Sequence, residues 1–160
     1  MNYTEEEIIR LAIINEEEGY AFYNMATKNT EDEDIKQLFE TLADQENQHR
    51  EWLHKTFVAI NSNKDQLTNH EQAPVSPGIF DLKKVNKIGS GELSSIHAAI
   101  LLEKNSMDFY SKAAAESEHE FAQILFQKLA KWESSHMDIL EKIYDSVRDD
   151  WWDRQRFSPA

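Results

Sequence analysis

The sequence predicts an all-α protein, a four-helix bundle in which two antiparallel helical hairpins are joined by a long crossover. Helix-forming residues dominate the 160 positions, with only four Gly and three Pro. Apolar residues recur at steps of three and four in long stretches, as on the buried face of a helix. The two halves of the chain also repeat each other at an offset of 87 positions. We expect helices over about 4–28, 31–61, 91–116 and 118–148.

Three of the four helix starts carry the capping-box pattern, in which a hydroxyl and a carboxylate three residues later satisfy each other's backbone amides. The pairs are Thr4 with Glu7, Thr30 with Glu33, and Ser117 with Glu120. The third helix is expected to begin near Ser90 or Ser94. The connections inside each half are short, so each half should fold back on itself as an antiparallel hairpin.

Residues 62–90 separate the two hairpins and contain Pro74, Pro77 and Gly78. This segment is long enough to cross the length of a bundle, so residues 1–148 are expected to form one domain. Residues 149–160 form an aromatic tail with Trp151, Trp152 and Phe157. These side chains are too apolar for a free tail, and we expect them to cover one end of the bundle or to contact a second subunit.

Composition excludes several classes of function. The chain has no cysteine, which removes disulfides, iron–sulfur clusters and thiolate nucleophiles. A net charge of −13 argues against a nucleic-acid partner. No apolar run reaches the roughly 18 residues of a membrane span. The first residues lack the features of a signal peptide, so a cytoplasmic location is expected.

The repeat places the same polar residues twice on the predicted buried faces. A lone glutamate precedes each Glu-x-x-His motif by thirty positions, giving Glu16, Glu46 and His49 in the first half and Glu103, Glu133 and His136 in the second. Each falls on the apolar stripe of its helix, and the hairpin geometry brings position 16 level with 46, and 103 level with 133. A twofold repeat of acidic and imidazole side chains is therefore expected inside the bundle.

A buried, ionised carboxylate costs many kcal/mol unless it is paired or bound to metal. Lys55, Lys142 and Arg50 lie off the stripes, so no basic side chain is expected beside the four glutamates. Two divalent cations balance four carboxylates. Carboxylate and imidazole ligands without sulfur suit iron or manganese, and less selectively zinc. Trp52 and Trp132 flank the Glu-x-x-His helices off the stripe, where packing is expected in preference to electron transfer.

The phrases Glu16-Glu-Glu-Gly-Tyr-Ala-Phe-Tyr23 and Asp44-Gln-Glu-Asn-Gln-His49 resemble the rubrerythrin branch of the ferritin-like di-metal carboxylate proteins. The resemblance covers both hairpins, about residues 5–145. It implies a ferritin-like bundle in which Glu46 and Glu133 bridge two metals, Glu16 and Glu103 are terminal ligands, and His49 and His136 bind one metal each. It also implies that Tyr23 and Tyr110 hydrogen-bond ligand carboxylates.

The chain departs from this family at two points. Ser106 stands where rubrerythrins usually carry a further carboxylate, and the chain has no cysteine-rich rubredoxin module. The resemblance implies a non-haem di-iron oxidoreductase that reduces peroxide or O2 with electrons from a separate protein such as rubredoxin, and a homodimer. Two Fe ions are the expected cofactors, with Mn or mixed Fe/Mn open and Zn as a crystallographic substitute. A ferroxidase or iron-binding protein, a dimanganese catalase-like protein and a metal-free helical adaptor remain alternatives.

Overall fold

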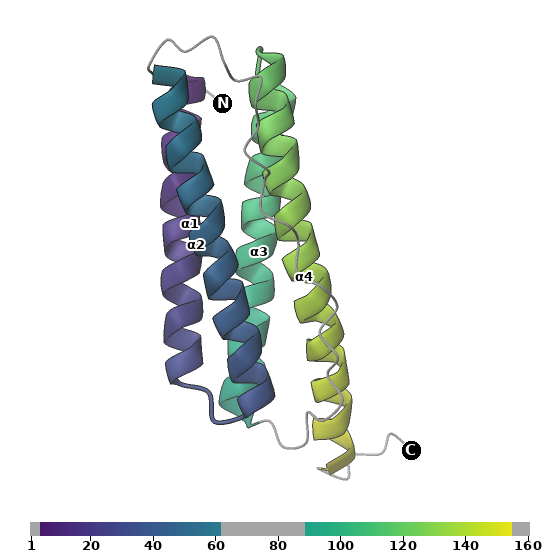
Figure 1. Cartoon of the computed structure of the whole chain (residues 1–160). Helices are drawn as coiled ribbons and strands as arrows, with labels where there is room; N and C mark the ends of the chain where they lie inside the picture. The colour runs from purple at the N-terminus through teal and green to yellow at the C-terminus, as the bar shows by residue number, and fades with distance from the viewer. Residues whose placement is uncertain (1–3, 62–88, 155–160) are drawn as a thin grey trace.

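The computed structural model describes residues 4–61 and 89–154 and contains four helices, with no strand in these two ranges. The helices are α1 (Glu5–Lys28), α2 (Glu33–Asn61), α3 (Ser90–Glu116) and α4 (Glu120–Arg154). They lie side by side as an elongated bundle (Figure 1). The predicted four-helix bundle is confirmed. None of these helices is both long enough and apolar enough to span a bilayer.

The helices pair as two hairpins, with α1 packed against α2 and α3 packed against α4. The hairpins meet so that α3 starts beside the start of α2 (Figure 1). At that end, the Glu92 Oε1 atom accepts hydrogen bonds from the backbone amides of Glu31 and Asp32, each at 3.0 Å. Consequently α2 and α3 run in the same direction, as the crossover prediction requires. The crossover itself lies outside the described residues, apart from Gly89 and Ser90.

Two of the predicted helix starts hold in atomic detail. The Thr4 hydroxyl accepts from the Glu7 amide at 3.3 Å, while the Glu7 carboxylate accepts from the Thr4 amide at 2.8 Å. Helix α3 begins at Ser90, and the Glu92 carboxylate accepts from the Gly89 amide at 2.7 Å. These contacts satisfy amides that no helical carbonyl can reach.

The other two predicted capping boxes are wrong. Asp32 caps α2, because its Oδ1 atom accepts from the amides of Asp34 and Ile35 at 3.0 and 3.1 Å. Thr30 instead donates its hydroxyl to the Ala26 carbonyl at the end of α1, and Ser117 donates likewise to Ala113 at the end of α3. Each loop is so short that its first hydroxyl residue still lies within reach of the preceding helix.

Helix α4 is longer than predicted and continues from the expected end at 148 to Arg154. The segment Asp149-Asp-Trp-Trp-Asp-Arg154 holds neither Gly nor Pro, so nothing in it stops a helix. The side chains of Trp151 and Trp152, and all of Phe157, lie outside the described part of the chain. The proposed role of this aromatic tail therefore stays a prediction.

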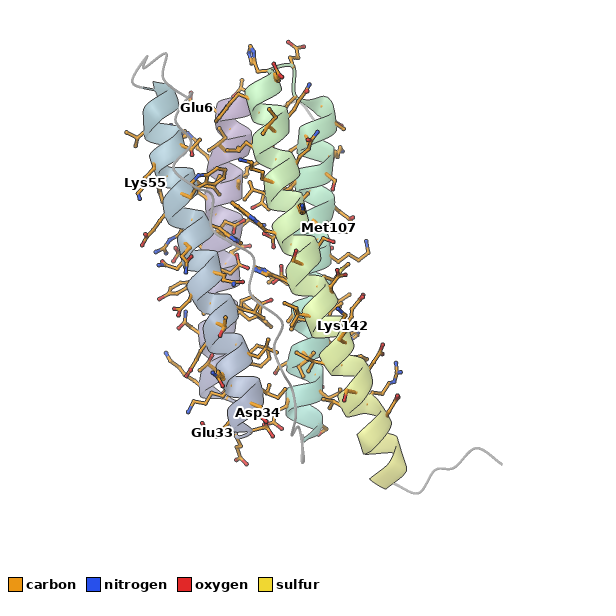
Figure 2. All side chains as sticks on the ribbon, turned by 45° about the vertical axis from the view of Figure 1, so that its right-hand side comes forward. Glu6, Glu33, Asp34, Lys55, Met107 and Lys142 are labelled. Carbon is orange, nitrogen blue, oxygen red and sulfur yellow. The ribbon has the colours of Figure 1, made fainter. Side chains whose placement is uncertain are left out.

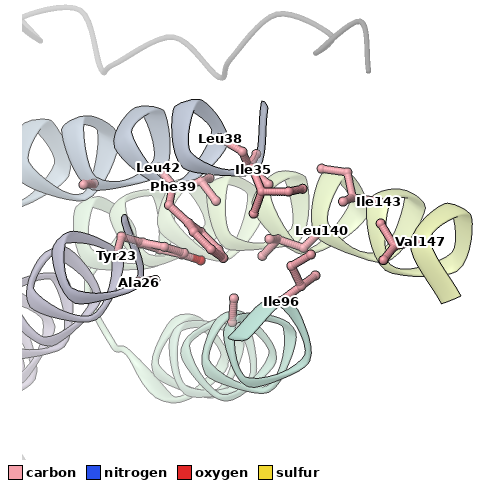
Figure 3. Packing of buried hydrophobic residues seen from close by; sticks show 12 residues of the cluster. Tyr23, Ala26, Ile35, Leu38, Phe39, Leu42, Ile96, Leu140, Ile143 and Val147 are labelled. Atoms are coloured by element: carbon pink, nitrogen blue, oxygen red, sulfur yellow. The ribbon is translucent and has the colours of Figure 1, made fainter. Parts of the chain in front are cut away.

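Two apolar clusters fill the bundle, one towards each end. The first includes Tyr23, Phe39, Leu42 and Leu140, which pack together in Figure 3. The second contains the repeat-related positions, among them Tyr110, Phe126, Leu129 and Leu53. Along every helix the predicted ligand positions fall between the residues of these two clusters. The apolar clusters thus enclose one polar layer at mid-height.

Lysines occupy the outside of the bundle. Lys55 and Lys142 point away from the interior in Figure 2, and both are exposed. Across the described residues, the buried polar and charged side chains include no Lys and no Arg. The polar layer is consequently acidic and has no Lys or Arg to balance it.

Replacing Asp32 by Ala is expected to destabilise the protein by about 1 kcal/mol, because the first turn of α2 loses its cap. Thr30→Ala is the matched control, since it leaves that cap in place and should cost less. Chemical denaturation measures both changes. Hydrogen exchange should also accelerate at the Asp34 and Ile35 amides in Asp32→Ala alone. A larger loss in Thr30→Ala would contradict the assignment of Asp32 as the cap.

Candidate metal centre

All six predicted ligand residues meet in the polar layer of the bundle. Each helix contributes from its buried face, and the six side chains are between 0 and 3 % exposed. Their ligand atoms form two overlapping groups, each within 4.8 Å. One group contains Glu16, Glu46, His49 and Glu133, and the other contains Glu46, Glu103, Glu133 and His136. Glu46 and Glu133 belong to both, which is the arrangement of two bridging carboxylates; that these residues bind metal ions stays a prediction.

Both histidines direct the same ring nitrogen at the carboxylates. The Nδ1 atom of His49 lies 3.1 Å from Glu16 Oε2 and 3.8 Å from Glu46 Oε2. The Nδ1 atom of His136 lies 3.1 Å from Glu46 Oε1 and 3.5 Å from Glu103 Oε2. The two rings are nearly parallel, with centroids 5.5 Å apart. Each imidazole is therefore oriented to donate one nitrogen lone pair to an ion within its own group.

Two tyrosines connect the hairpins through the terminal glutamates. The Tyr23 hydroxyl of α1 donates to Glu103 of α3, and the Tyr110 hydroxyl of α3 donates to Glu16 of α1. Both tyrosines are fully buried, and burial raises the pKa of each well above its ordinary value, with a further contribution from the neighbouring carboxylates. The hydroxyls consequently keep their protons and hold Glu103 and Glu16 in place.

Small side chains make room beside the carboxylates. A Cβ atom placed on Gly19 would come within 3.2 Å of the Glu46 side chain. The repeat-related position is Ser106, which is buried and accepts a hydrogen bond from Asn15 at 2.8 Å. Asn15 also donates to the Tyr110 hydroxyl at 3.1 Å. Ser106 stands where rubrerythrins usually carry a carboxylate, so that place holds a neutral side chain that is hydrogen-bonded to Asn15.

Several buried polar atoms in this layer lack a hydrogen-bond partner among the described residues. They are Glu46 Oε1, Glu103 Oε2, Glu133 Oε1 and His136 Nδ1. The last lies 3.1 Å from Glu46 Oε1 without forming a hydrogen bond to it. Buried polar atoms are normally satisfied, and unpaired ones cost free energy. All four are potential metal-ligand atoms, so a bound cation would satisfy them together, and the donor set fits a di-metal carboxylate site.

The carboxylates in this layer differ in how readily they ionise. Burial raises the pKa of Glu16 to about 8, and the negative charge of Glu46 adds to the shift. Burial and the surrounding carboxylates likewise raise the pKa of Glu133 well above its ordinary value. For Glu46 burial acts in the same direction, but the neighbouring imidazoles of His136 and His49 outweigh it and keep its pKa below the usual range. The shared glutamate next to both histidines therefore ionises most readily.

The histidines respond in the opposite sense. Burial alone would lower the pKa of His136, but attraction to the neighbouring carboxylates of Glu103 and Glu46 raises it to about 10. The pKa of His49 is also raised, because its hydrogen bond to Glu16 and the nearby carboxylate of Glu46 outweigh its burial. At neutral pH, protons therefore balance part of the negative charge in this layer. A metal ion must displace such protons, because ligands bind in their deprotonated form.

Sequence reasoning missed two residues that contact the histidines. Gln45 Oε1 lies 2.7 Å from His136 Nε2, and the Trp132 ring stacks on His49 with centroids 4.4 Å apart. Trp132 was expected to pack on a neighbouring helix, and it does so against a predicted ligand. Both residues lie directly before a shared glutamate, one position off the buried stripe. The sequence did carry one signal for them, because positions 45 and 132 are related by the same offset of 87 as the predicted ligands.

Gly19→Ala is expected to weaken metal binding about 10- to 100-fold, as changes beside metal ligands commonly do, because the added methyl group displaces Glu46. Gly91→Ala is the matched control, since a Cβ atom there meets nothing within 4 Å. Calorimetric titration with a divalent metal measures both affinities. Equal affinity of Gly19→Ala and the unmodified chain would show that Glu46 does not need this clearance.

Comparisons with known proteins agree with this geometry. The rubrerythrin family model matches residues 7–144. A hypothetical protein from Pyrococcus furiosus has a similar structure, with a TM-score of 0.69, 22 % identity and 92 % of each chain covered. At that identity the likeness shows the fold alone. No curated protein matches the chain. The family match and the buried Glu and His cluster together indicate a metal-binding protein of the di-metal carboxylate type, and the chain belongs to the rubrerythrin family.

Proposed function

We propose that this protein is a non-haem di-iron oxidoreductase that reduces peroxide or O2 with electrons from an external donor. The observation that carries the proposal is the pair of overlapping ligand groups that share Glu46 and Glu133. Shared carboxylates hold two ions close enough to act on one small molecule. Two iron ions, when bound, would supply one electron each, and these two electrons are the number that reductive cleavage of the O–O bond of peroxide requires.

The protein's own residues would prepare the site for this chemistry. Glu16 and Glu103 complete the two groups, and their hydrogen bonds from Tyr110 and Tyr23 fix the carboxylate orientations. The apolar clusters above and below the layer exclude water from it. A low-dielectric surrounding strengthens the electrostatic interactions of the ligands. The two tyrosine hydroxyls hold protons next to the terminal glutamates, where a reduced oxygen product requires them.

The donor of electrons is a further part of the proposal. The 160-residue chain holds no cysteine, so it carries no thiolate-bound iron of its own. We propose that the reducing electrons come from a separate protein such as rubredoxin, and that the protein works as a homodimer. Light scattering separates this assembly from iron storage, since storage requires a hollow shell of many subunits.

Anaerobic loading with Fe(II) is expected to give about two irons per chain, one for each ligand group. Addition of one equivalent of peroxide should then produce the near-ultraviolet absorption of ferric iron, and reduced rubredoxin should remove it. Glu16→Gln should lower both the iron content and the reaction. Glu18→Gln is the matched control, because Glu18 lies next to the same turn and is exposed.

The same experiment distinguishes the alternative functions. Iron that is oxidised but then released or deposited without turnover of peroxide would favour a ferroxidase. Dismutation of peroxide to O2 by the manganese-loaded protein without any donor would favour a catalase-like enzyme. A protein that binds iron but gives no absorption change with peroxide or O2 would overturn the oxidoreductase proposal.

A further inference from the structure

The two halves of the repeat differ in the side chain that packs against each histidine. The residues directly before the shared glutamates are Gln45 and Trp132, which are 87 positions apart. Gln45 of α2 contacts His136 of α4, and Trp132 of α4 contacts His49 of α2. Each residue thus supports the histidine of the opposite hairpin, but one does so through an amide oxygen and the other through an indole face.

Gln45 determines which nitrogen of His136 is available. Its Oε1 atom accepts a hydrogen bond from His136 Nε2 at 2.7 Å, and both side chains are buried. A proton held on Nε2 leaves the lone pair of the neutral ring on Nδ1, the atom that faces Glu46 and Glu103. An acceptor behind a metal-binding imidazole also makes that imidazole a stronger donor. His136 is therefore oriented for a cation before one arrives.

Trp132 gives His49 a different environment. Its ring lies nearly parallel to the imidazole, at an angle of 9°, and is itself 8 % exposed. Trp52 packs edge-on against Trp132, with centroids 5.3 Å apart. An indole has a donor and no acceptor, so Trp132 cannot hold a proton on the His49 ring. It orients His49 by packing alone.

The buried atoms of the polar layer that lack a hydrogen-bond partner also distinguish the two ligand groups. Two of these atoms, Glu103 Oε2 and His136 Nδ1, belong to the His136 group alone, and the other two, Glu46 Oε1 and Glu133 Oε1, belong to the residues that both groups share. Glu133 Oε1 lies 4.0 Å from the Nδ1 atom of His49. In the other group, the Nδ1 atom of His49 already lies at hydrogen-bond distance from Glu16 Oε2, and Glu16 accepts from Tyr110. A cation in the His136 group relieves more unsatisfied atoms and breaks fewer existing hydrogen bonds.

We propose that the two metal positions are unequal, that the position at His136 fills first, and that Gln45 is the positioning residue that sets this order. The proposal rests on the metal binding in the proposed function and adds to it a sequence of loading. Trp132 then serves as an internal reporter, since its emission responds most strongly to an ion bound by the histidine on which it stacks.

Titration of the full chain with Co²⁺ tests the proposal. Calorimetry is expected to resolve two events of about one ion each, one for each ligand group. Visible absorption of Co²⁺ should rise from the first equivalent, while the larger part of the tryptophan quenching should follow with the second. Trp132→Phe should remove this late quenching and leave the affinity of the first event unchanged. Trp52→Phe should retain it.

Gln45→Leu should weaken the tighter event about 10- to 100-fold and leave the weaker event nearly unchanged. Gln45→Glu keeps an acceptor at the same place and should restore tight binding, which a residue needed only for packing would not do. Circular dichroism and thermal unfolding without metal check that each variant folds. The order of absorption and quenching in the unmodified chain decides the question even if a variant fails to fold.

Three outcomes would overturn the inference while leaving the proposed function intact. They are two ions of equal affinity, quenching that mainly accompanies the first ion, and equal weakening of both events in Gln45→Leu. Binding of no ion by the unmodified chain would overturn the inference and the proposed function together. Two resolved events with late quenching and a selective effect of Gln45→Leu would support it.

Discussion

The structure depends on one electrostatic constraint, the confinement of four glutamates in a bundle interior that holds no buried Lys or Arg within the described residues. Apolar packing above and below cannot stabilise these charges, and two histidines balance only part of them. The raised pKa of Glu16, Glu133 and His136 is the direct consequence, since protons take the place of counter-charges. Divalent cations would meet the same requirement more fully, because each would also bind ligand atoms that lack a hydrogen-bond partner.

The four glutamates are divided between the two hairpins. Neither hairpin carries a complete ligand group. One group combines residues of α1 and α2 with Glu133 of α4, and the other combines residues of α3 and α4 with Glu46 of α2. Tyr23 and Tyr110 strengthen the same junction, since each donates to the glutamate of the other hairpin. A metal pair bound here would therefore stabilise the association of the hairpins as well as the site, and folding and metal binding are expected to be coupled.

Much of this architecture was predictable from the sequence, because apolar periodicity and an exact repeat both report on buried faces. The stripe through Leu42, Glu46, His49 and Leu53 is buried as predicted, and so is its counterpart through Leu129, Glu133, His136 and Leu140. The errors concern short-range choices between competing hydrogen bonds. Thr30 and Ser117 bond to the helix before them, and Asp32 caps α2 instead. Gln45 and Trp132 escaped prediction because contacts across helices depend on side-chain direction, which a stripe pattern does not specify.

Anomalous diffraction at the iron edge, from crystals grown anaerobically with Fe(II), tests the central claim most directly. We expect two peaks roughly 3.5–4 Å apart, both between the carboxylates of Glu46 and Glu133, with one next to His49 and the other next to His136. Peaks confined to the acidic surface, or an interior without any peak in crystals that contain iron, would contradict it.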